Sequence, residues 1–221
     1  AADLDSVFAA NIVHGDGLFS EIPAASVVIT NPPYMGARSM PKQTREALKI
    51  FAPFDGDLSS AFMRRCFDLS TVCTGVLAQQ SFWFVRQFEA ARNALLREGH
   101  LDTFVHFGPG VFRALNGEKA SVVGVVLDRG EGLTKFHDLR EGKAAQKRLH
   151  WHRTNAKEMD VSRFKTIPGN PLAHWLSDPL IKQFSAMPRL GDYFEIPTQN
   201  KTGNNQKFVQ KIDQLRDEDL M

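Results

Sequence analysis

The 221-residue chain is 43% hydrophobic, contains seventeen Phe and has a formal net charge of +2. Its length fits one ordinary domain, or one domain with an appendage, and its apolar content suffices for a packed core. The longest apolar runs fall well short of the roughly 20 residues that span a bilayer, and the N-terminus does not read as a secretory signal, so we expect no membrane association. Cys66 and Cys73 form no C-x-x-C pair, and we expect them to be reduced core residues of a cytoplasmic protein.

Strand and helix patterns alternate along the first 140 residues. Short β-branched runs predict strands, and apolar residues three and four positions apart predict helices. In chain order we expect helix 2–10, strand 11–14, strand 27–30, helix 41–51, helix 57–72, strand 75–79, helix 86–98, strand 101–107, strand 121–127 and a hairpin strand at 133–139. This alternation predicts an α/β fold, with a partial Rossmann-like sheet that is mostly parallel, is covered on both faces and ends in an antiparallel hairpin.

Beyond residue 140 the chain becomes polar and irregular. Five prolines interrupt any long element in this part of the chain, namely Pro168, Pro171, Pro179, Pro188 and Pro197. We therefore predict two parts, with residues 1–140 belonging to the α/β domain and residues 141–221 forming an irregular extension.

The residues Asn31-Pro32-Pro33-Tyr34 follow directly after the strand expected at 27–30. In open α/β sheets, ligands bind just beyond the carboxyl ends of the strands. Each proline fixes φ at about −65°, so two in succession stiffen the loop. Asn-Pro alone would indicate a rigid turn, but all four residues after a strand favour a reactive site.

The side chains of this loop suit methyl transfer to a planar exocyclic amine, such as that of adenine. This amine is a poor nucleophile because its lone pair is delocalised into the ring. The amide oxygen of Asn31 and the backbone carbonyl of Pro32 can accept its hydrogens, which frees the lone pair for in-line attack on a methyl sulfonium. Tyr34 offers a flat face on which an extruded base can stack.

With this motif, the chain resembles the amino-group DNA methyltransferases that have an Asn/Asp-Pro-Pro-Tyr signature. It is most similar to the adenine-specific branch, which includes the large methyltransferases of bacterial restriction and phage-exclusion systems. Residues 31–40 and 54–66 are typical of that subgroup, and the likeness extends from about residue 11 to about residue 208.

The resemblance implies a site-specific, adenine-specific DNA methyltransferase with the methyltransferase version of the sheet. Its methyl donor would be S-adenosylmethionine, its partner double-stranded DNA, and its location the bacterial cytoplasm. Asn31, Pro32, Pro33 and Tyr34 would be its catalytic residues.

Two further site residues follow from the resemblance. Asp16 matches the acidic residue that accepts a hydrogen bond from the amino group of the cofactor's adenine. Phe112 matches an aromatic residue that stacks on the far side of the flipped base from the tyrosine, and Phe107 is the rival for that role. From the residues alone, Asp16 also fits an ordinary glycine turn, and Phe112 fits a core Phe beside a loop.

The chain departs from the family before residue 11. The family binds its cofactor with a Gly-rich turn after the first strand and an acidic residue after the second, whereas the ten residues before Asn11 contain no Gly. We therefore expect a fragment or one half of a split enzyme, inactive in isolation, whose cofactor motif comes from an upstream domain or a second chain. The strands at 11–14 and 27–30 would then have exposed edges.

Charge is distributed unevenly along the chain. Residues 1–134 have twelve Lys/Arg against fourteen Asp/Glu, residues 135–211 have fourteen against seven, and the last ten residues have a net charge of −3. The net charge of +7 over 135–211 would attract a phosphate backbone, although ordinary solvated surfaces have similar excesses. Residues 202–208 resemble the entry to the subgroup's target-recognition region, which we expect the extension to lead into.

Two other motifs indicate no site. His150-x-His152 has the spacing of a metal-ligand pair but no acidic or thiol partner nearby, so we expect no metal. Gly108-Pro109-Gly110 lacks the G-x-G-x-x-G pattern of a dinucleotide-binding turn.

Two alternatives to a DNA methyltransferase remain open. One is a non-catalytic remnant of the fold that binds DNA or protein. The other is a methyltransferase that acts on a protein glutamine, because that side-chain amide suits the same Asn-Pro-Pro-Tyr chemistry. The basic segment and the start of a recognition region favour DNA.

Overall fold

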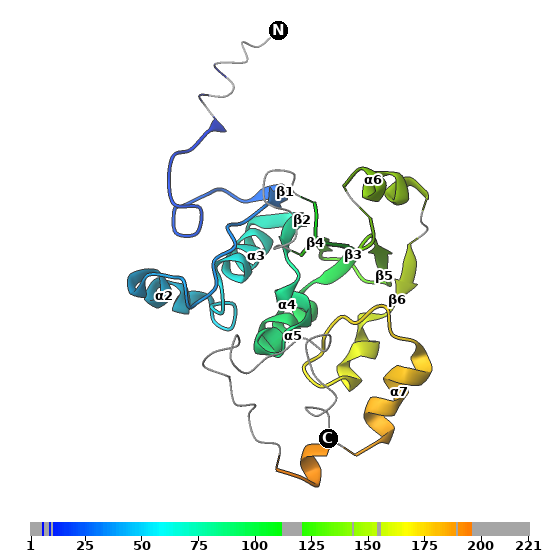
Figure 1. Ribbon diagram of the computed structural model, residues 1–221. Helices are drawn as coiled ribbons and strands as arrows, with labels where there is room; N and C mark the ends of the chain where they lie inside the picture. Colours follow the sequence, from blue (N-terminus) through cyan, green and yellow to red (C-terminus); the bar gives the residue numbers. More distant parts are fainter. Residues whose placement is uncertain are drawn as a thin grey trace, which may run out of the picture. The chain divides into compact units, whose positions relative to one another are not determined.

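The computed structural model describes residues 6, 9, 11–111, 121–142, 144–153, 156–188 and 190–195. Contacts divide the chain into two compact units, Ala1–Ser185 and Ala186–Met221. The first unit contains a six-stranded sheet with its helices (Figure 1). In the second unit, the described residues include the 3₁₀ turn η4 (Leu190–Asp192), followed by the exposed side chains of Tyr193 and Phe194.

The sheet consists of β1 (Ala25–Thr30), β2 (Ser70–Gln79), β3 (His100–Gly108), β4 (Val122–Asp128), β5 (Thr134–Asp138) and β6 (Lys157–Met159). The strand order is β1-β2-β4-β3-β5-β6. β1 is parallel to β2 and β3 is parallel to β5, whereas β4 lies antiparallel between β2 and β3, and β6 is antiparallel to β5. Four of the six strands therefore run in one direction, and the expected α/β fold class with a mostly parallel sheet is confirmed. The expectation that both faces of the sheet are covered is wrong for β1, where Val27 and Ile29 on one face are 51% and 83% exposed.

Helices connect β1 to β2 and β2 to β3. Between β1 and β2 lie α2 (Lys42–Leu48), the 3₁₀ turn η1 (Lys49–Phe51) and α3 (Leu58–Leu69). Between β2 and β3 lie α4 (Ser81–Phe84), the 3₁₀ turn η2 (Arg86–Phe88) and α5 (Glu89–Glu98). After β5 come α6 (Ala144–Arg153), β6, the 3₁₀ helix η3 (Val161–Thr166) and α7 (Asp178–Ala186).

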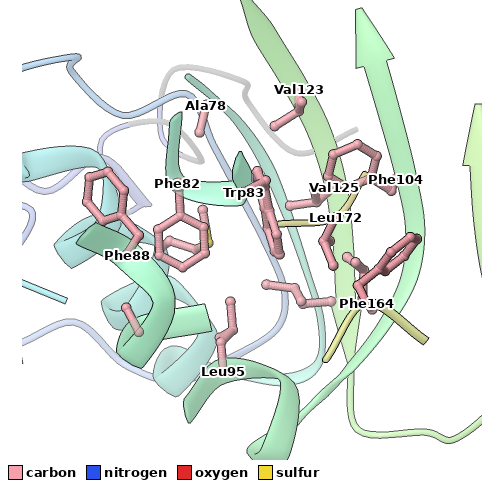
Figure 2. Close-up of a cluster of buried hydrophobic side chains, with 14 of the residues drawn as sticks. Ala78, Phe82, Trp83, Phe88, Leu95, Phe104, Val123, Val125, Phe164 and Leu172 are labelled. Carbon is pink, nitrogen blue, oxygen red and sulfur yellow. The ribbon is translucent and has the colours of Figure 1, made fainter. Parts of the chain in front are cut away.

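The main core lies between one face of the sheet and a helical layer formed by α3, α4, α5, η3 and α7. Figure 2 shows Trp83, from the connection after β2, beside Val125 of β4 and Phe104 of β3, with Phe82 and Phe88 on its other side. Phe164 and Leu172 belong to the same cluster, so the chain beyond residue 140 contributes to this core. Trp83 and Phe104 meet edge to face with ring centroids 5.6 Å apart, an arrangement that aromatic quadrupoles favour.

The strand expected at 11–14 is absent. Asn11 is helical, residues 12–14 form no regular element, and the side chains of Ile12 and Val13 are each 72% exposed. β-branched residues form a strand where a neighbouring strand pairs with them, and no strand of the described residues pairs with this segment. The helix expected at 2–10 lies largely outside the described residues.

Two other boundaries differ from expectation because of pairing across the sheet. The helix expected to reach residue 72 ends at Leu69, since the chain from Ser70 onward pairs with β1. The strand expected at 133–139 exists, but its partner is β3 in parallel and not β4 in a hairpin. Both edges of β4 are already occupied by β2 and β3, so β5 cannot pair with β4 and joins the free edge of β3.

The region beyond residue 140 contains more regular structure than its composition indicates. α6, β6, η3 and α7 are separated by loops, and Pro179 lies in the first turn of α7, where a proline does not interrupt the helix.

Candidate active site

The Asn31–Tyr34 loop begins where β1 ends. Thr30 pairs with Val76 of the parallel strand β2, so Asn31 lies at the carboxyl edge that β1 and β2 share. Pro32 is buried, Tyr34 is half-buried, and Asn31 and Pro33 are exposed. The structure thus anchors the loop through one proline and presents the Asn31 amide to solvent.

The side chains of Asn31 and Tyr34 are in direct contact. The Tyr34 hydroxyl donates a hydrogen bond to Asn31 Oδ1 at 3.0 Å and lies 3.4 Å from the carbonyl oxygen of Leu77 in β2. Burial raises the pKa of the Tyr34 phenol above its ordinary value, which keeps the hydroxyl protonated and able to donate. The loop therefore holds the Asn31 amide oxygen in a fixed direction.

The loop is supported from the start of α3. The backbone N–H of Leu58 donates to the carbonyl of Met35 at 3.0 Å, and Gly36 forms an isolated antiparallel bridge with Asp57. Asp57 caps α3 by accepting from the Ser60 N–H at 2.6 Å. Burial raises the pKa of the Asp57 carboxyl, and its hydrogen bonds with Ser60 oppose that rise.

Asp16 lies in an exposed turn. Its Oδ1 accepts the backbone N–H of Leu18 at 2.9 Å, and its carbonyl accepts from the N–H of Ser20 at 2.8 Å. Leu18 is 4% exposed and packs in a second small core cluster, which fixes the turn to the domain. The turn role of Asp16 is thus plain in the structure, and its contact with a cofactor stays a prediction.

Of the two candidate stacking residues, Phe107 lies in the described part of the chain and Phe112 lies outside it. Phe107, its rival, is a half-buried residue of β3, and its ring lies 3.0 Å from the position that a Cβ on Gly124 would take. Phe107 and Asn31 both line one hollow of about 740 Å³.

This hollow also brings together residues that the sequence did not connect with the site. Lys147, Arg148 and Trp151 of α6 line it, more than a hundred positions along the chain from Asn31. These three residues were not predicted as site residues because the chain beyond residue 140 was expected to be irregular. The apolar Trp151 within a basic segment was the one local sign of a helix face.

A buried imidazole pair lies on the other face of the sheet. His106 of β3 and His174 are 3% and 5% exposed, and His106 Nδ1 lies 3.0 Å from His174 Nε2. His106 Nε2 lies 2.9 Å from Gln80 Oε1, so the three side chains form one hydrogen-bonded chain. Desolvation lowers the pKa of each imidazole to about 4, which keeps both neutral.

The described part of the chain contains no group of three or more His, Cys, Asp or Glu side chains arranged to hold a metal ion. Of its helices, none is long and apolar enough to cross a membrane. The side chain of His152, from the His150-x-His152 pair, lies outside the described residues.

Comparison with known proteins shows to which family the Asn31–Tyr34 loop and its surroundings are similar. The family model of the Eco57I restriction-modification methylases matches residues 20–112, which include the Asn31–Tyr34 loop. This segment belongs to the Eco57I restriction-modification methylase family. The resemblance read from the motif is therefore confirmed.

Two curated relatives extend the likeness beyond this methylase segment. The adenine-specific methyltransferase BrxX of Escherichia coli O9:H4 (strain HS) is 32% identical over 173 residues, which are 74% of this chain and 14% of that protein. The adenine-specific methyltransferase PglX of Lacticaseibacillus casei (strain Zhang) is 25% identical over 201 residues, which are 83% of this chain and 16% of that protein. The chain thus spans about one seventh of the length of these relatives.

Among solved structures, similar chains include the methyltransferase subunit of a type I restriction-modification system from Streptococcus thermophilus. The match has a TM-score of 0.49 and 18% identity, and it covers 70% of this chain and 40% of that one.

Proposed function

We propose that this chain provides the catalytic loop of an adenine-specific DNA methyltransferase. The observation that supports this most directly is the Asn31 amide oxygen, which lies at the carboxyl edge of β1, accepts a hydrogen bond and is exposed beside an aromatic ring. A hydrogen-bond acceptor next to a flat ring is what binding of an extruded adenine requires. The match of residues 20–112 to a methylase family agrees with the proposal.

In the proposed reaction, Asn31 Oδ1 and the carbonyl oxygen of Pro32 accept the two hydrogens of the adenine amine. Both acceptors belong to a loop that two prolines stiffen, so little reorganisation is needed when the base enters. The Tyr34 hydroxyl has to leave Asn31 Oδ1, or share it, before the base is bound. The Tyr34 ring then offers its face to the base.

The methyl donor of the proposed reaction is S-adenosylmethionine. Asp16 fits one contact with it, because the residue is exposed and its carboxylate accepts the Leu18 N–H through Oδ1. Among the described residues no other donor reaches this carboxylate, which leaves acceptor capacity for an amine. The first strand of the described sheet, β1, is followed by Asn31-Pro32-Pro33-Tyr34 and not by the Gly-rich turn that the family uses for the rest of the cofactor. We therefore propose that an upstream domain or a second chain supplies those contacts.

The proposed partner is double-stranded DNA. Residues 135–211 have a net charge of +7, and the exposed side chains of Arg148, Lys165 and Lys182 lie within the described part of that segment. Such cations bind phosphates without regard to sequence, whereas selection of a target site needs contacts to base edges. In this proposal, residues beyond 141 lead toward the region that makes those contacts.

Methylation by the chain combined with its cofactor half tests the proposal. Nucleosides digested from the treated DNA should contain N6-methyladenine, and the Asn31→Ala variant should form it far more slowly. Methylated glutamine in protein, with unmodified DNA, would instead support the protein-glutamine alternative. DNA binding without any methyl transfer would support the non-catalytic remnant.

A further inference from the structure

The carboxyl ends of β1, β2, β3 and β5 lie at one edge of the sheet, because β4 runs antiparallel between β2 and β3. Paired residues follow this edge from Ala78 of β2, through Val123 of β4 and His106 of β3, to Asp138 of β5. Ligands of α/β sheets bind along such an edge. Side chains that follow β5 therefore belong to the same edge as Asn31, four strand spacings away, or roughly 19 Å at about 4.8 Å per spacing.

The guanidinium of Arg140, two residues after β5, is held in one direction. Its Nε and Nη2 donate to the two carboxylate oxygens of Asp138 at 2.9 and 2.7 Å. It also lies over the ring of Trp175, with the central carbon 4.7 Å from the ring centroid. The side chain is 38% exposed, and the fork to Asp138 uses only part of the five N–H donors of a guanidinium. Arg140 is thus oriented and still able to donate to a ligand.

The backbone around Arg140 is equally well fixed. The N–H of Leu139 donates to the carbonyl of His106 at 2.8 Å, and the Lys147 ammonium donates to the carbonyl of Arg140 at 2.9 Å. Gly108, with φ of 66°, ends β3 so close to this segment that a Cβ would lie 3.2 Å from the Arg140 Cα. A ligand of Arg140 therefore meets a preformed surface.

Trp175 forms a platform beneath the guanidinium. The residue is 46% exposed, although one side of its ring packs on the aromatic core. Its ring centroid lies 5.3 Å from that of Phe84 and 5.2 Å from that of His174. His174 is in turn fixed by its contact of 3.0 Å with His106. An exposed aromatic ring with a cation across its face is a common element of nucleic-acid-binding surfaces.

The charge around this platform is positive. Three charged groups of the described residues act on the neighbouring His174, namely the cations Arg140 and Lys157 and the carboxylate of Asp138. Both cations lie in the segment 135–211, which has a net charge of +7. An anionic ligand is therefore favoured over a cationic or an apolar one.

We propose that Arg140 and Trp175 bind the DNA backbone beside the target adenine. In this arrangement Arg140 donates to a phosphate, and the Trp175 ring supports the guanidinium and contacts the adjoining sugar. The inference rests on the proposed function, because it takes DNA as the substrate. A separation of roughly 19 Å from Asn31 is about half a turn of B-DNA, whose turn is about 34–36 Å. The contact therefore holds the duplex without competing for the flipped base.

The first test measures the affinity of the whole chain for a labelled duplex of about 20 base pairs, two helical turns. Arg140→Gln should weaken binding by about tenfold near 50 mM salt and reduce the slope of log Kd against log salt by about one. Arg140→Lys retains the charge but not the planar fork, so it should restore the slope and only part of the affinity. Fluorescence anisotropy over a salt series measures each value.

The matched control for this charge lies near the other end of β5. Lys135 is 48% exposed and pairs with Asp102 at 3.1 Å, so it resembles Arg140 in exposure and in having a carboxylate partner. Lys135→Gln removes the same charge from the same strand away from the carboxyl edge. It should weaken DNA binding by no more than about twofold.

The second test uses the fluorescence of Trp175. Of the three tryptophans, Trp83 is 0% exposed, whereas Trp151 and Trp175 are 42% and 46% exposed. Added DNA should change the emission of the unmodified chain and of Trp151→Phe, and the change should be lost in Trp175→Phe. Trp175→Ala should weaken DNA binding by about two- to fivefold, the worth of one exposed cation–π contact. Circular dichroism checks that each variant is folded.

Three outcomes would overturn the inference. Equal effects of Arg140→Gln and Lys135→Gln would mean that only overall charge matters. Unchanged DNA affinity in Arg140→Gln and Trp175→Ala would make the pair a brace of the fold or a contact for a protein. In both cases the chain still binds DNA, and the proposed function stands. Failure of the chain to bind DNA even at low salt would overturn this contact together with the proposed DNA partner.

Discussion

The Tyr34 hydroxyl donates to Asn31 Oδ1 across 3.0 Å, so one lone pair of the exposed amide oxygen is engaged within its own loop. The same hydroxyl lies 3.4 Å from the Leu77 carbonyl, which ties the ring to β2. In the proposed reaction the hydroxyl and the adenine amine compete for Asn31. The Tyr34 ring and the Tyr34 hydroxyl therefore have opposite effects on base binding, and substitutions can separate them.

Tyr34→Phe should keep or improve capture of the flipped base, because it removes the competing hydroxyl and retains the stacking face. Tyr34→Ala should weaken capture by about 1–3 kcal/mol, the usual worth of one base–aromatic stack. The fluorescence of 2-aminopurine at the target position in DNA reports base extrusion for both variants. If Phe and Ala weaken capture equally, the hydroxyl and not the ring binds the base.

Asn31→Ala should slow methyl transfer by about 10²–10³-fold, because it removes an acceptor that matters most as the amine becomes tetrahedral. Affinity for DNA should change little. Single-turnover methylation in the complete enzyme measures this step apart from binding. Asn31→Asp, which retains an acceptor oxygen and matches the family's Asn/Asp signature, is the control and should recover part of the rate.

The position of the Asn31–Tyr34 loop could be predicted from the sequence because the signal for it is local. Four adjacent residues after a β-branched run are enough to place Asn31 at the end of a strand, and β1 ends at Thr30 as expected. The Leu77 and Asp57 contacts of the loop were missed because residues 43 and 21 positions apart meet only through the pairing of β1 with β2 and the start of α3. No local pattern reports such a contact.

The errors in the fold have the same origin. Residues 11–14 have the composition of a strand but lack a pairing partner among the described residues, and β5 joins β3 because β4 has no edge left. α6 is defined less by its polar sequence than by Lys147, which bonds to three carbonyls of other segments. In each case, strand pairing or hydrogen bonds between segments far apart in the sequence determine the structure, and the local sequence does not encode them.

Arg92→Met should destabilise the fold by about 2–4 kcal/mol. The Arg92 side chain is fully buried and donates to the carbonyls of Phe82, Val85, Gly169 and Asn170. Desolvation lowers its pKa to about 10, so it stays charged at neutral pH, and its loss leaves buried carbonyls without donors. Urea unfolding measures the effect.

The control for Arg92 lies on the same helix. The Arg97 side chain is 74% exposed and forms a long ion pair of 3.9 Å with Glu98. Arg97→Met should change stability by no more than about 0.5 kcal/mol. A loss as large as that of Arg92→Met would point to an effect of methionine in α5 and not to the buried hydrogen bonds.

Stability should fall as the pH drops from about 6.5 toward 4. His106 and His174 have folded pKa values of about 4 against 6.5 in the unfolded chain, so the unfolded state binds more protons in this window. The stabilisation is fully present above pH 6.5 and is lost on acidification, by about 1–3 kcal/mol. Melting temperatures measured across the window check this, and His174→Gln should flatten the profile. A profile that stays as steep in that variant would exclude the pair as the cause.

DNA binding should be strongly salt-dependent, since each phosphate contact releases condensed counterions. If the basic 135–211 segment makes three to five such contacts, affinity should fall by about 40- to 500-fold between roughly 50 and 200 mM salt. Lys165→Gln and Lys182→Gln should each reduce the slope of log Kd against log salt by about one where the residue contacts a phosphate. Lys49→Gln is the control, because Lys49 lies outside the segment and pairs with Glu46 at 2.6 Å. Gel shifts over a salt series measure all three variants, and an affinity that is flat with salt would make the basic segment an ordinary solvated surface.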